Sequence, residues 1–397
     1  MSGFRHRYGL FLLLCCVAFA TFFCAYLRIP VLPLLAVSLG AGPAQVGIIN
    51  GTFMLATGIL SIPAGLLADR IGPRIPAVGG ILAAALSSFL VTQCTTPGQM
   101  AAAYLLFGVG LAAFIPSMLS QVADSFPVEK LGQAYGWYST AMYVAITLGP
   151  ATGGYLGKHL GLRQVFYLSA GLLLLVALLA LVFLPRSSTL RKRETQAILA
   201  AGVSLFRNRA LVACLLVTWG AAMGFGIFVS FFPLYASGAG LDPAQVGLVF
   251  AAQAITNVIS RIPVGIAADR FDRRWIVAAG ILFFAAGLAL LGLFRQTASL
   301  SLCAVVLGIG MAFTFTAVGA LIAESVPPLQ RGLAMGMYNS SVYLAMMAGS
   351  TIFGICISVI GYPAGFGLGG IAAMLGLGAF LLVMRHRSQP MHGTSLL

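Results

Sequence analysis

The chain has 397 residues, of which 60% are hydrophobic and 8% are charged, and its mean hydropathy is +1.01. A water-soluble domain carries about 25% charged residues, so this composition excludes an ordinary soluble protein and indicates one that lies in lipid. The formal net charge of +14 would fit a nucleic-acid partner, and the placement of the basic residues has to decide that question.

Apolar runs long enough to cross a membrane recur along the whole chain. A hydrocarbon core of about 30 Å requires about 20 apolar residues in a helix. The first run is longer than the roughly 7 to 15 residues of a signal-peptide core and lacks a clear cleavage site, so we expect a retained helix. We predict twelve helical spans, at 9–36, 44–69, 75–95, 99–124, 132–157, 162–185, 209–237, 244–269, 275–294, 298–324, 332–360 and 364–384.

The basic residues alternate between the predicted loops. Most of the 22 Lys and Arg residues fall on one side of the twelve spans, whereas the other side has Lys158, Arg163 and Arg295. Because loops rich in Lys and Arg stay in the cytoplasm, we expect both termini to be cytoplasmic, in a bacterial inner membrane. The positive charge then reports topology and contact with the lipid bilayer, and no nucleic-acid partner is expected.

Signatures of enzyme chemistry are missing from the sequence. There is no phosphate-binding P-loop, no Gly-x-Ser-x-Gly elbow and no His-Glu-x-x-His motif, and the loops are too short for a catalytic domain. The seven cysteines form no Cys-x-x-Cys or Cys/His cluster, and we interpret them as small packing residues. We therefore expect no enzyme, no metal site and no cofactor.

An internal repeat with an offset of 200 residues organises the chain. "PAQVG" occurs at 43–47 and at 243–247, and "ADR" occurs at 68–70 and at 268–270. Six spans per copy is an even number, so both copies insert with the same orientation and form parallel repeats. The sequence predicts an all-α membrane protein of two pseudo-symmetric six-helix bundles, with domains at 1–185 and 209–397 joined by a cytoplasmic linker at 186–208.

Two copies of one loop motif carry a family resemblance. "GLLADRIGPR" (65–74) and "GIAADRFDRR" (265–274) resemble the loop 2/3 signature of the major facilitator superfamily. The resemblance implies alternating access, with acidic helix ends that meet arginines and helix N-termini of the other half and so hold a cytoplasmic gate; solvated loop charges are the alternative. The gating candidates are Asp69, Arg70, Arg74, Asp124, Asp269, Arg270, Arg273, Arg274 and Glu324.

A second motif lies in the fifth predicted span. "GPATGG", with Gly149, Pro150, Gly153 and Gly154, resembles the helix 5 motif of drug and metabolite antiporters. Pro150 removes a backbone donor and kinks the helix, and the glycines permit a close contact that we expect against a helix of the second half. The resemblance favours export over uptake, and ordinary glycine packing is the alternative.

Two departures from the antiporter pattern bear on proton coupling. Relatives usually have an arginine four residues before the helix 4 glycine, where this chain has Tyr104 before Gly108. None of the eight acidic residues lies in the middle of a span, although an embedded carboxylate is a usual proton carrier. Proton coupling therefore remains open on the sequence.

Both charges that lie well inside the predicted spans, away from the span ends, are positive. Arg28 and Arg261 each lie about 12 Å from the nearer end of their span. A charge that faces lipid at the membrane centre costs at least about 2.5 kcal/mol, so both should face the protein interior. Gln253, Asn257 and Arg261 recur every four residues and so share one helical face. For each arginine, substrate contact and a structural role both remain open.

Other polar and aromatic residues on the predicted cavity helices are further candidates for substrate contact, although aromatic residues at helical spacing also serve in packing. They are Tyr26, Gln121, Tyr138, Phe228, Tyr338 and Asn339.

The function expected from these features is secondary transport. A channel would not require paired halves with matched gate motifs. We expect a monomer that exports a small organic solute, a drug or a metabolite and plausibly an anion, with protons as the coupling ion. The alternative is a carrier for uptake, exchange or uniport of organic anions, because a guanidinium binds a carboxylate bidentately.

Overall fold

The computed structural model of the protein describes residues 2–126, 131–185, 202, 204–327 and 330–385, and these residues form helices and no strand. The first half contains α1 (Ser2–Tyr26), α2 (Val31–Ser38), α3 (Pro43–Ile71), α4 (Arg74–Gln93), α5 (Pro97–Ser125), α6 (Leu131–His159) and α7 (Leu162–Phe183). The second half contains α9 (Arg209–Gly238), α10 (Pro243–Arg270), α11 (Arg273–Leu291), α12 (Thr297–Ser325), α13 (Arg331–Ile360) and α14 (Tyr362–Arg385). The predicted linker at 186–208 lies almost entirely outside the described residues.

The predicted membrane architecture is confirmed. Eleven segments of the described chain are long and apolar enough to cross a membrane, α1 and α2 counting as one. The remaining predicted span corresponds to α6, which has 29 residues and is less apolar because it is rich in Gly, Tyr and Thr. The outer face of α7 exposes Leu174, Leu178 and Val182. An apolar patch of this kind is rare on the surface of a soluble protein and is typical of a surface that contacts lipid.

The first predicted span differs from a single helix. Residues 27–30 form a turn between α1 and α2. Pro30 has no backbone N–H, and its ring disfavours helical geometry at Ile29. The break divides the span into a long helix and a short one, which changes the direction in which the side chains around Arg28 point.

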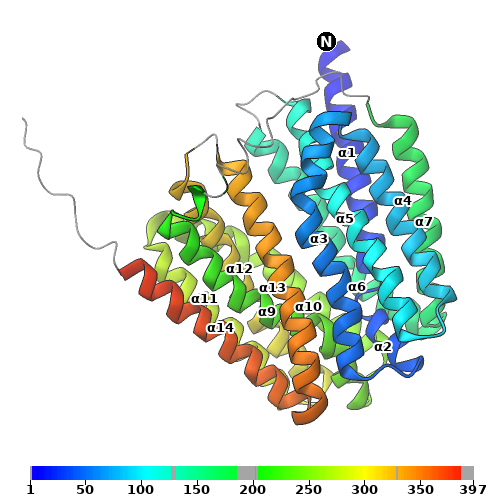
Figure 1. The fold of residues 1–397 in the computed structure, drawn as a ribbon, viewed down its shortest axis with the longest axis vertical. Helices are drawn as coiled ribbons and strands as arrows, with labels where there is room; N and C mark the ends of the chain where they lie inside the picture. The colour runs from blue at the N-terminus through cyan, green and yellow to red at the C-terminus, as the bar shows by residue number, and fades with distance from the viewer. Residues whose placement is uncertain (1, 127–130, 186–201, 203, 328–329, 386–397) are drawn as a thin grey trace, which may run out of the picture.

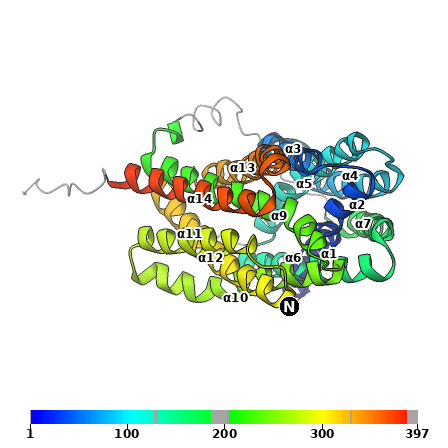
Figure 2. The ribbon, with the colours of Figure 1, turned by 90° about the horizontal axis from the view of Figure 1, so that it is seen from below.

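The 200-residue offset of the sequence is also an offset of the helices. α5 and α12 begin and end at positions that differ by 200, and α3 and α10 both begin at the proline of "PAQVG". At these two helix starts Gln45 Oε1 and Gln245 Oε1 accept equivalent hydrogen bonds from the backbone N–H groups of Gly42 and Asp242. Figure 1 shows α1–α7 on one side of the molecule and α9–α14 on the other, and Figure 2 shows the same division from below.

Two seams join the halves, one between α3 and α13 and one between α6 and α10. We call the end of the molecule with the loops at 71–73 and 271–272 the basic end, and the end with the loops at 39–42 and 239–242 the far end. Glycines close both seams toward the far end. A Cβ on Gly47 would collide with the carbonyl of Ser350, and a Cβ on Gly154 would collide with the carbonyl of Pro243.

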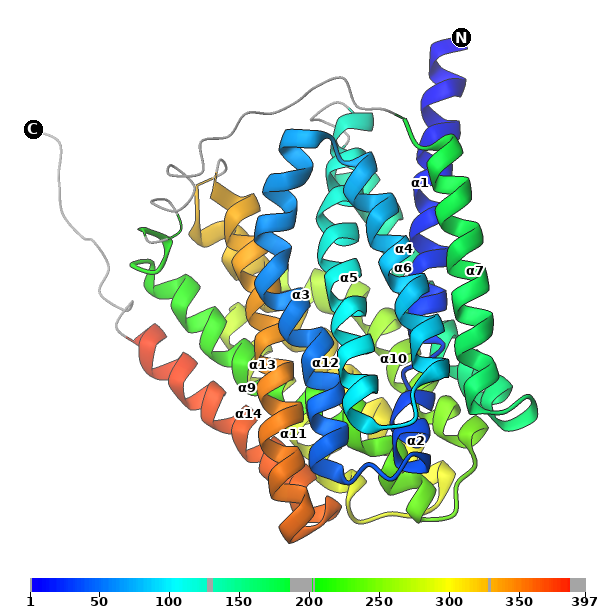
Figure 3. The ribbon, with the colours of Figure 1, turned by 45° about the vertical axis from the view of Figure 1, so that its right-hand side comes forward.

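Toward the basic end the same helices separate. A Cβ added to Gly136 on α6, Gly265 on α10 or Gly336 on α13 would meet no heavy atom within 4 Å. Figure 3 shows the second half leaning away from the first in this direction. The molecule is therefore packed along its seams at the far end and open between the halves at the basic end.

Candidate functional site

The polar stripe of α10 is fixed by contacts in its own half. The side chains of Gln253 and Asn257 are 6% and 5% exposed. Gln253 Nε2 donates to the sulfur of Met311 at 3.1 Å, and Asn257 Nδ2 donates to the carbonyl of Gly308 at 3.4 Å. Asn257 Oδ1 in turn accepts from Arg261 Nε at 3.0 Å. These two amides anchor the stripe against α12 and orient the guanidinium at its end.

Arg261 reaches across the α6–α10 seam into the first half. Its Cζ lies 4.1 Å from the ring centroid of Tyr143 on α6, which is a cation–π contact. The side chain is half-buried. Apart from the bond to Asn257, it hydrogen-bonds to no described residue, so the two Nη groups remain available on a cation that has no acidic partner in the described chain.

Three further tyrosines gather around this contact. Tyr26 on α1 and Tyr343 on α13 interact electrostatically with Tyr143, and Tyr338 interacts with both Tyr143 and Arg261. The four phenol hydroxyls donate to no described residue. We call these five residues the Arg261 cluster; both halves contribute to it, and it brings together one cation and four phenol side chains.

The Arg261 cluster breaks the two-fold symmetry of the chain. Tyr143 and Tyr343 are equivalent by the 200-residue offset, but the equivalent of Arg261 is Ser61. The Ser61 hydroxyl donates back to the carbonyl of Thr57 in its own helix, at 2.5 Å. The α6–α10 seam therefore carries a cation where the α3–α13 seam carries a self-satisfied hydroxyl.

Arg28 lies elsewhere, inside the first half. It is 0% exposed, its Nη1 donates to Ser88 Oγ at 2.7 Å, and its Cζ lies 3.7 Å from the ring centroid of Phe107. Its Nε donates to the carbonyl of Ala25 at 3.3 Å, at the C-terminal end of α1, where a cation is stabilised by the helix dipole. The structure thus surrounds Arg28 with protein and does not bring it into the Arg261 cluster.

Of the other sequence candidates, Tyr26 and Tyr338 join the Arg261 cluster and four do not. Gln121 and Tyr138 are buried, and their side-chain polar atoms have no partner in the described chain. Phe228 packs between Phe232 and Phe250, at centroid distances of 5.2 and 4.8 Å. Asn339 is exposed, next to Tyr338 on α13.

Sequence reasoning did not single out Tyr143 and Tyr343 as site residues. The signal was present, because both are tyrosines at equivalent positions of the two copies. What the repeat alone did not indicate is that α6 and α13, the helices that carry them, each form one of the two seams between the halves.

The helix 5 motif packs against two partners. In the same half, an ideal Cβ on Gly149 would collide with Tyr26 at the end of α1, and one on Gly153 would collide with Leu27 in the turn that follows α1. We expected all the glycines of the motif to contact a helix of the second half. Of these three glycines, Gly154 does so, because a Cβ there would meet Pro243 at the start of α10. Pro150 lies inside α6. The motif therefore packs α6 closely against the end of α1 and the turn after it, and at Gly154 against the second half.

The gate candidates lie at the basic end. Arg273 forms an ion pair with Glu324 within the second half, and its Nε donates to the carbonyl of Ala268 at 3.0 Å. Arg74 donates to the carbonyl of Leu181 within the first half. Arg274 Nε lies 3.9 Å from Asp272 Oδ1. Asp69 is half-buried, and the exposed candidates are Arg70, Asp124 and Arg270. The side chain of Asp269 lies outside the described part of the chain.

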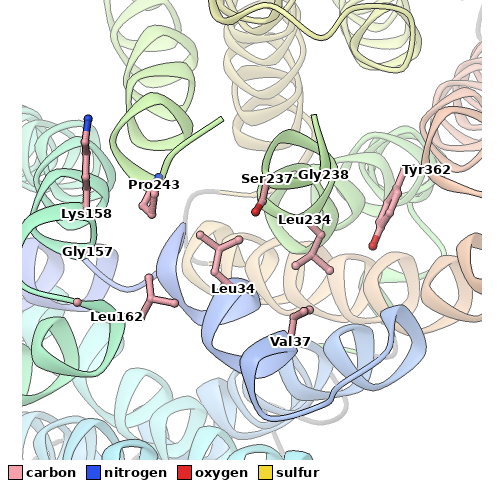
Figure 4. Close-up of a pocket in the computed structure, with 11 residues that line it drawn as sticks. Leu34, Val37, Gly157, Lys158, Leu162, Leu234, Ser237, Gly238, Pro243 and Tyr362 are labelled. Carbon is pink, nitrogen blue, oxygen red and sulfur yellow. The ribbon is translucent and has the colours of Figure 1, made fainter. Parts of the chain in front are cut away.

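A cavity of about 570 Å³ lies at the far end, away from the Arg261 cluster. Figure 4 shows that both halves line it, with Leu34 and Leu162 from the first half and Leu234 and Pro243 from the second. Its polar lining consists of Ser237, Tyr362 and Lys158. Within the described residues, no group of three or more His, Cys, Asp or Glu side chains could hold a metal ion.

Two parallel helical halves that are closed at one end and open at the other are the architecture of an alternating-access transporter. The chain belongs to the major facilitator superfamily, whose family model matches residues 14–243 and 214–395. This confirms the resemblance carried by the two loop motifs.

Relatives and solved structures agree with this assignment. An uncharacterized MFS-type transporter of Methanocaldococcus jannaschii is 23% identical over 84% of this chain and 87% of that protein. The multidrug efflux protein YfmO of Bacillus subtilis is 25% identical over 90% of this chain and 88% of that protein. A bacterial homologue of the human lysosomal transporter Spinster, solved in an inward-facing and unoccupied conformation, matches with a TM-score of 0.82 at 15% identity, over 96% of this chain and 97% of that chain.

Proposed function

We propose that this protein is a secondary transporter that exports a small organic anion, a drug or a metabolite, by alternating access driven by the proton gradient. It acts as a monomer in the inner membrane of a bacterium, with the basic end and both termini in the cytoplasm. The structure then corresponds to the state in which the substrate enters from the cytoplasm. The segments 1–185 and 209–397 move as two bundles about the linker at 186–208.

The observation that carries the anion assignment is the free guanidinium edge of Arg261. Its face rests on the ring of Tyr143 at 4.1 Å and its Nε is held by Asn257, so its orientation is fixed before a ligand arrives. The remaining N–H groups form a planar fork that matches a carboxylate. The hydroxyls of Tyr26, Tyr338 and Tyr343 can donate to the same anion, and their rings favour a substrate with a flat apolar body.

Export is supported by the helix 5 motif and by the efflux relative. In this proposal the gate candidates at the basic end, among them Asp69, Arg70 and Arg74, close against the second half when the far end opens. Arg273 and Glu324 are already paired within the second half, so that half would move as a rigid unit.

Uptake, exchange or uniport of organic anions is the second candidate. The observation that favours it is the position of the acidic residues. Those that the structure describes lie at helix ends or loops, as Asp69, Asp124, Asp242, Asp272 and Glu324 do. An embedded carboxylate that could carry a proton is missing from the described spans, whereas exchange of one anion for another requires none.

Transport in proteoliposomes tests the proposal. Purified protein is assayed with a panel of aliphatic carboxylates, aromatic carboxylates and cationic dyes, with and without an imposed pH gradient. We expect aromatic carboxylates to move and the pH gradient to drive their accumulation. Movement of cationic dyes while carboxylates stay behind would contradict the anion assignment. Carboxylate transport that ignores the pH gradient but is accelerated by anion on the opposite side would establish exchange.

A further inference from the structure

Among the residues that the structure describes, one ion pair joins the two halves at the far end. Lys158 Nζ, in the last turn of α6, lies 2.8 Å from Asp242 Oδ2, the residue before α10. The two side chains are 46% and 34% exposed. Asp242 also caps α10, because its Oδ1 accepts from the backbone N–H of Gln245 at 2.9 Å. The carboxylate is therefore held in place by its own helix and offers its other oxygen to the opposite half.

This ion pair is restricted to one seam. The repeat places Gly42 and Ser358 at the positions equivalent to Asp242 and Lys158 on the α3–α13 seam. Gly42 precedes α3 and has no side chain, and the Ser358 hydroxyl donates to the carbonyl of Ile355 in its own helix at 2.6 Å. Asp242 is the one acidic residue of the far-end loops.

Other contacts described between the halves at the far end involve no formal charge. Ser350 Oγ donates to the carbonyl of Gly47 at 2.9 Å across the α3–α13 seam. Gly154 and Gly247 bring α6 and α10 together backbone to backbone. Such contacts depend on shape and persist at high salt, whereas an exposed ion pair is screened by salt.

We propose that Lys158 and Asp242 form a one-sided electrostatic latch that holds the far end closed and has to break each time this end opens. This role rests on alternating access between the halves but not on the identity of the substrate. The latch lies on the α6–α10 seam, the same seam on which Arg261 contacts Tyr143 of the other half. Toward the far end, the contacts described for the α3–α13 seam are uncharged, so this end of that seam parts without breaking an ion pair.

The ion pair persists throughout the ordinary pH range. The hydrogen bond from the Lys158 ammonium, followed by that from the Gln245 backbone N–H, lowers the pKa of Asp242 from its ordinary value of 3.8. A carboxyl whose pKa is lowered in the closed state stabilises that state above its ordinary pKa, and the stabilisation is lost as the pH falls through the lowered value. Ionic strength, and not pH near neutrality, is therefore the condition that weakens the latch.

The rate at which a buried cysteine is labelled from the far side measures how often this end opens. The reporter is Ser350→Cys, in a chain whose seven native cysteines are replaced by serine. Ser350 is 0% exposed in the closed far end, so a membrane-impermeant maleimide reaches position 350 only in the open state. This readout requires no substrate, so it separates failure of the latch from failure of the proposed function.

Two neutral variants test the pair. Lys158→Gln removes the ammonium, and Asp242→Asn removes the charge while keeping a good helix cap. Each should raise the labelling rate by up to about fivefold, the range of an exposed ion pair, and the double variant should raise it no further. In 1 M KCl the wild-type rate should approach that of the variants. The matched control is Arg163→Gln, another far-end cation, whose guanidinium donates to the carbonyl of Cys94 and whose loss should leave the rate unchanged.

Moving the latch to the other seam provides a gain-of-function test. Gly42→Asp with Ser358→Lys recreates the pair at the equivalent positions, and a Cβ at Gly42 meets open space. This variant should label more slowly than the wild type. Labelling rates of Lys158→Gln and Asp242→Asn equal to that of Arg163→Gln would overturn the proposal. It would also be overturned if the two effects multiplied independently in the double variant, because the side chains would then act separately.

Discussion

Gly247 provides a direct test of the closed far end. An ideal Cβ at this position would lie 2.6 Å from the carbonyl oxygen of Pro150 and 3.2 Å from the Cα of Ala151, both backbone atoms of α6 that cannot rotate away. Gly247→Ala therefore forces α6 and α10 apart in the closed far end and meets no such obstacle once the seam has opened. Overpacking of this kind costs about 1–3 kcal/mol, which corresponds to a shift of about 5- to 150-fold toward the open far end.

The assay is maleimide labelling of Ser350→Cys from the far side. Gly265→Ala is the matched control, because it makes the same replacement on the same helix at a position with no heavy atom within 4 Å. Both variants gain the same helix propensity, so the difference between their labelling rates isolates the seam contact. Equal rates would refute the conclusion that glycine packing at Gly247 closes the far end.

Two further predictions concern the aromatic and buried contacts of the arginines. Tyr143→Phe keeps the ring face under Arg261 and should preserve most of the affinity for a transported carboxylate. Tyr143→Ala should weaken this affinity about 5- to 30-fold, because it removes a cation–π contact worth about 1–2 kcal/mol. Equal carboxylate affinities of the two variants, measured by calorimetry, would contradict the proposed role of the ring. Arg28→Gln should lower the melting temperature in detergent, because it removes a buried charged hydrogen bond to Ser88 worth about 1.5–3 kcal/mol, and should leave carboxylate affinity nearly unchanged. An unaltered melting temperature combined with lost affinity would instead place Arg28 in contact with the substrate.

The sequence indicated the architecture well because that architecture depends on periodic signals. Hydropathy defines the spans, and the placement of Lys and Arg predicts their orientation. The 200-residue offset shows which helix of one half is equivalent to which helix of the other. The stripe from Gln253 through Asn257 to Arg261 shares one helical face, but it is Arg261 that contacts the other half, whereas the two amides contact α12 in their own half. Helical periodicity shows which residues share a face.

Periodicity does not show what a face contacts. Arg28 lies in the turn at residues 27–30, after the helical phase of α1 has ended, so its direction into the first half could not be read from its spacing to Tyr26. Tyr143 became a site residue only when α6 was placed against α10. Asn339, one residue beyond Tyr338, is exposed because a step of one residue rotates the side chain by about 100° around the helix.

Whether Arg261 binds the anionic group of the substrate is tested most directly by comparing one carboxylate with its own amide. Binding of both compounds is measured to the wild type, to Arg261→Gln and to Arg295→Gln, which removes an exposed far-end arginine. A charged hydrogen bond is worth about 1.5–3 kcal/mol, so Arg261→Gln should weaken binding of the carboxylate about 10- to 150-fold, with the amide little affected and Arg295→Gln like the wild type. Equal carboxylate affinities of the wild type and Arg261→Gln would contradict the assignment of this site.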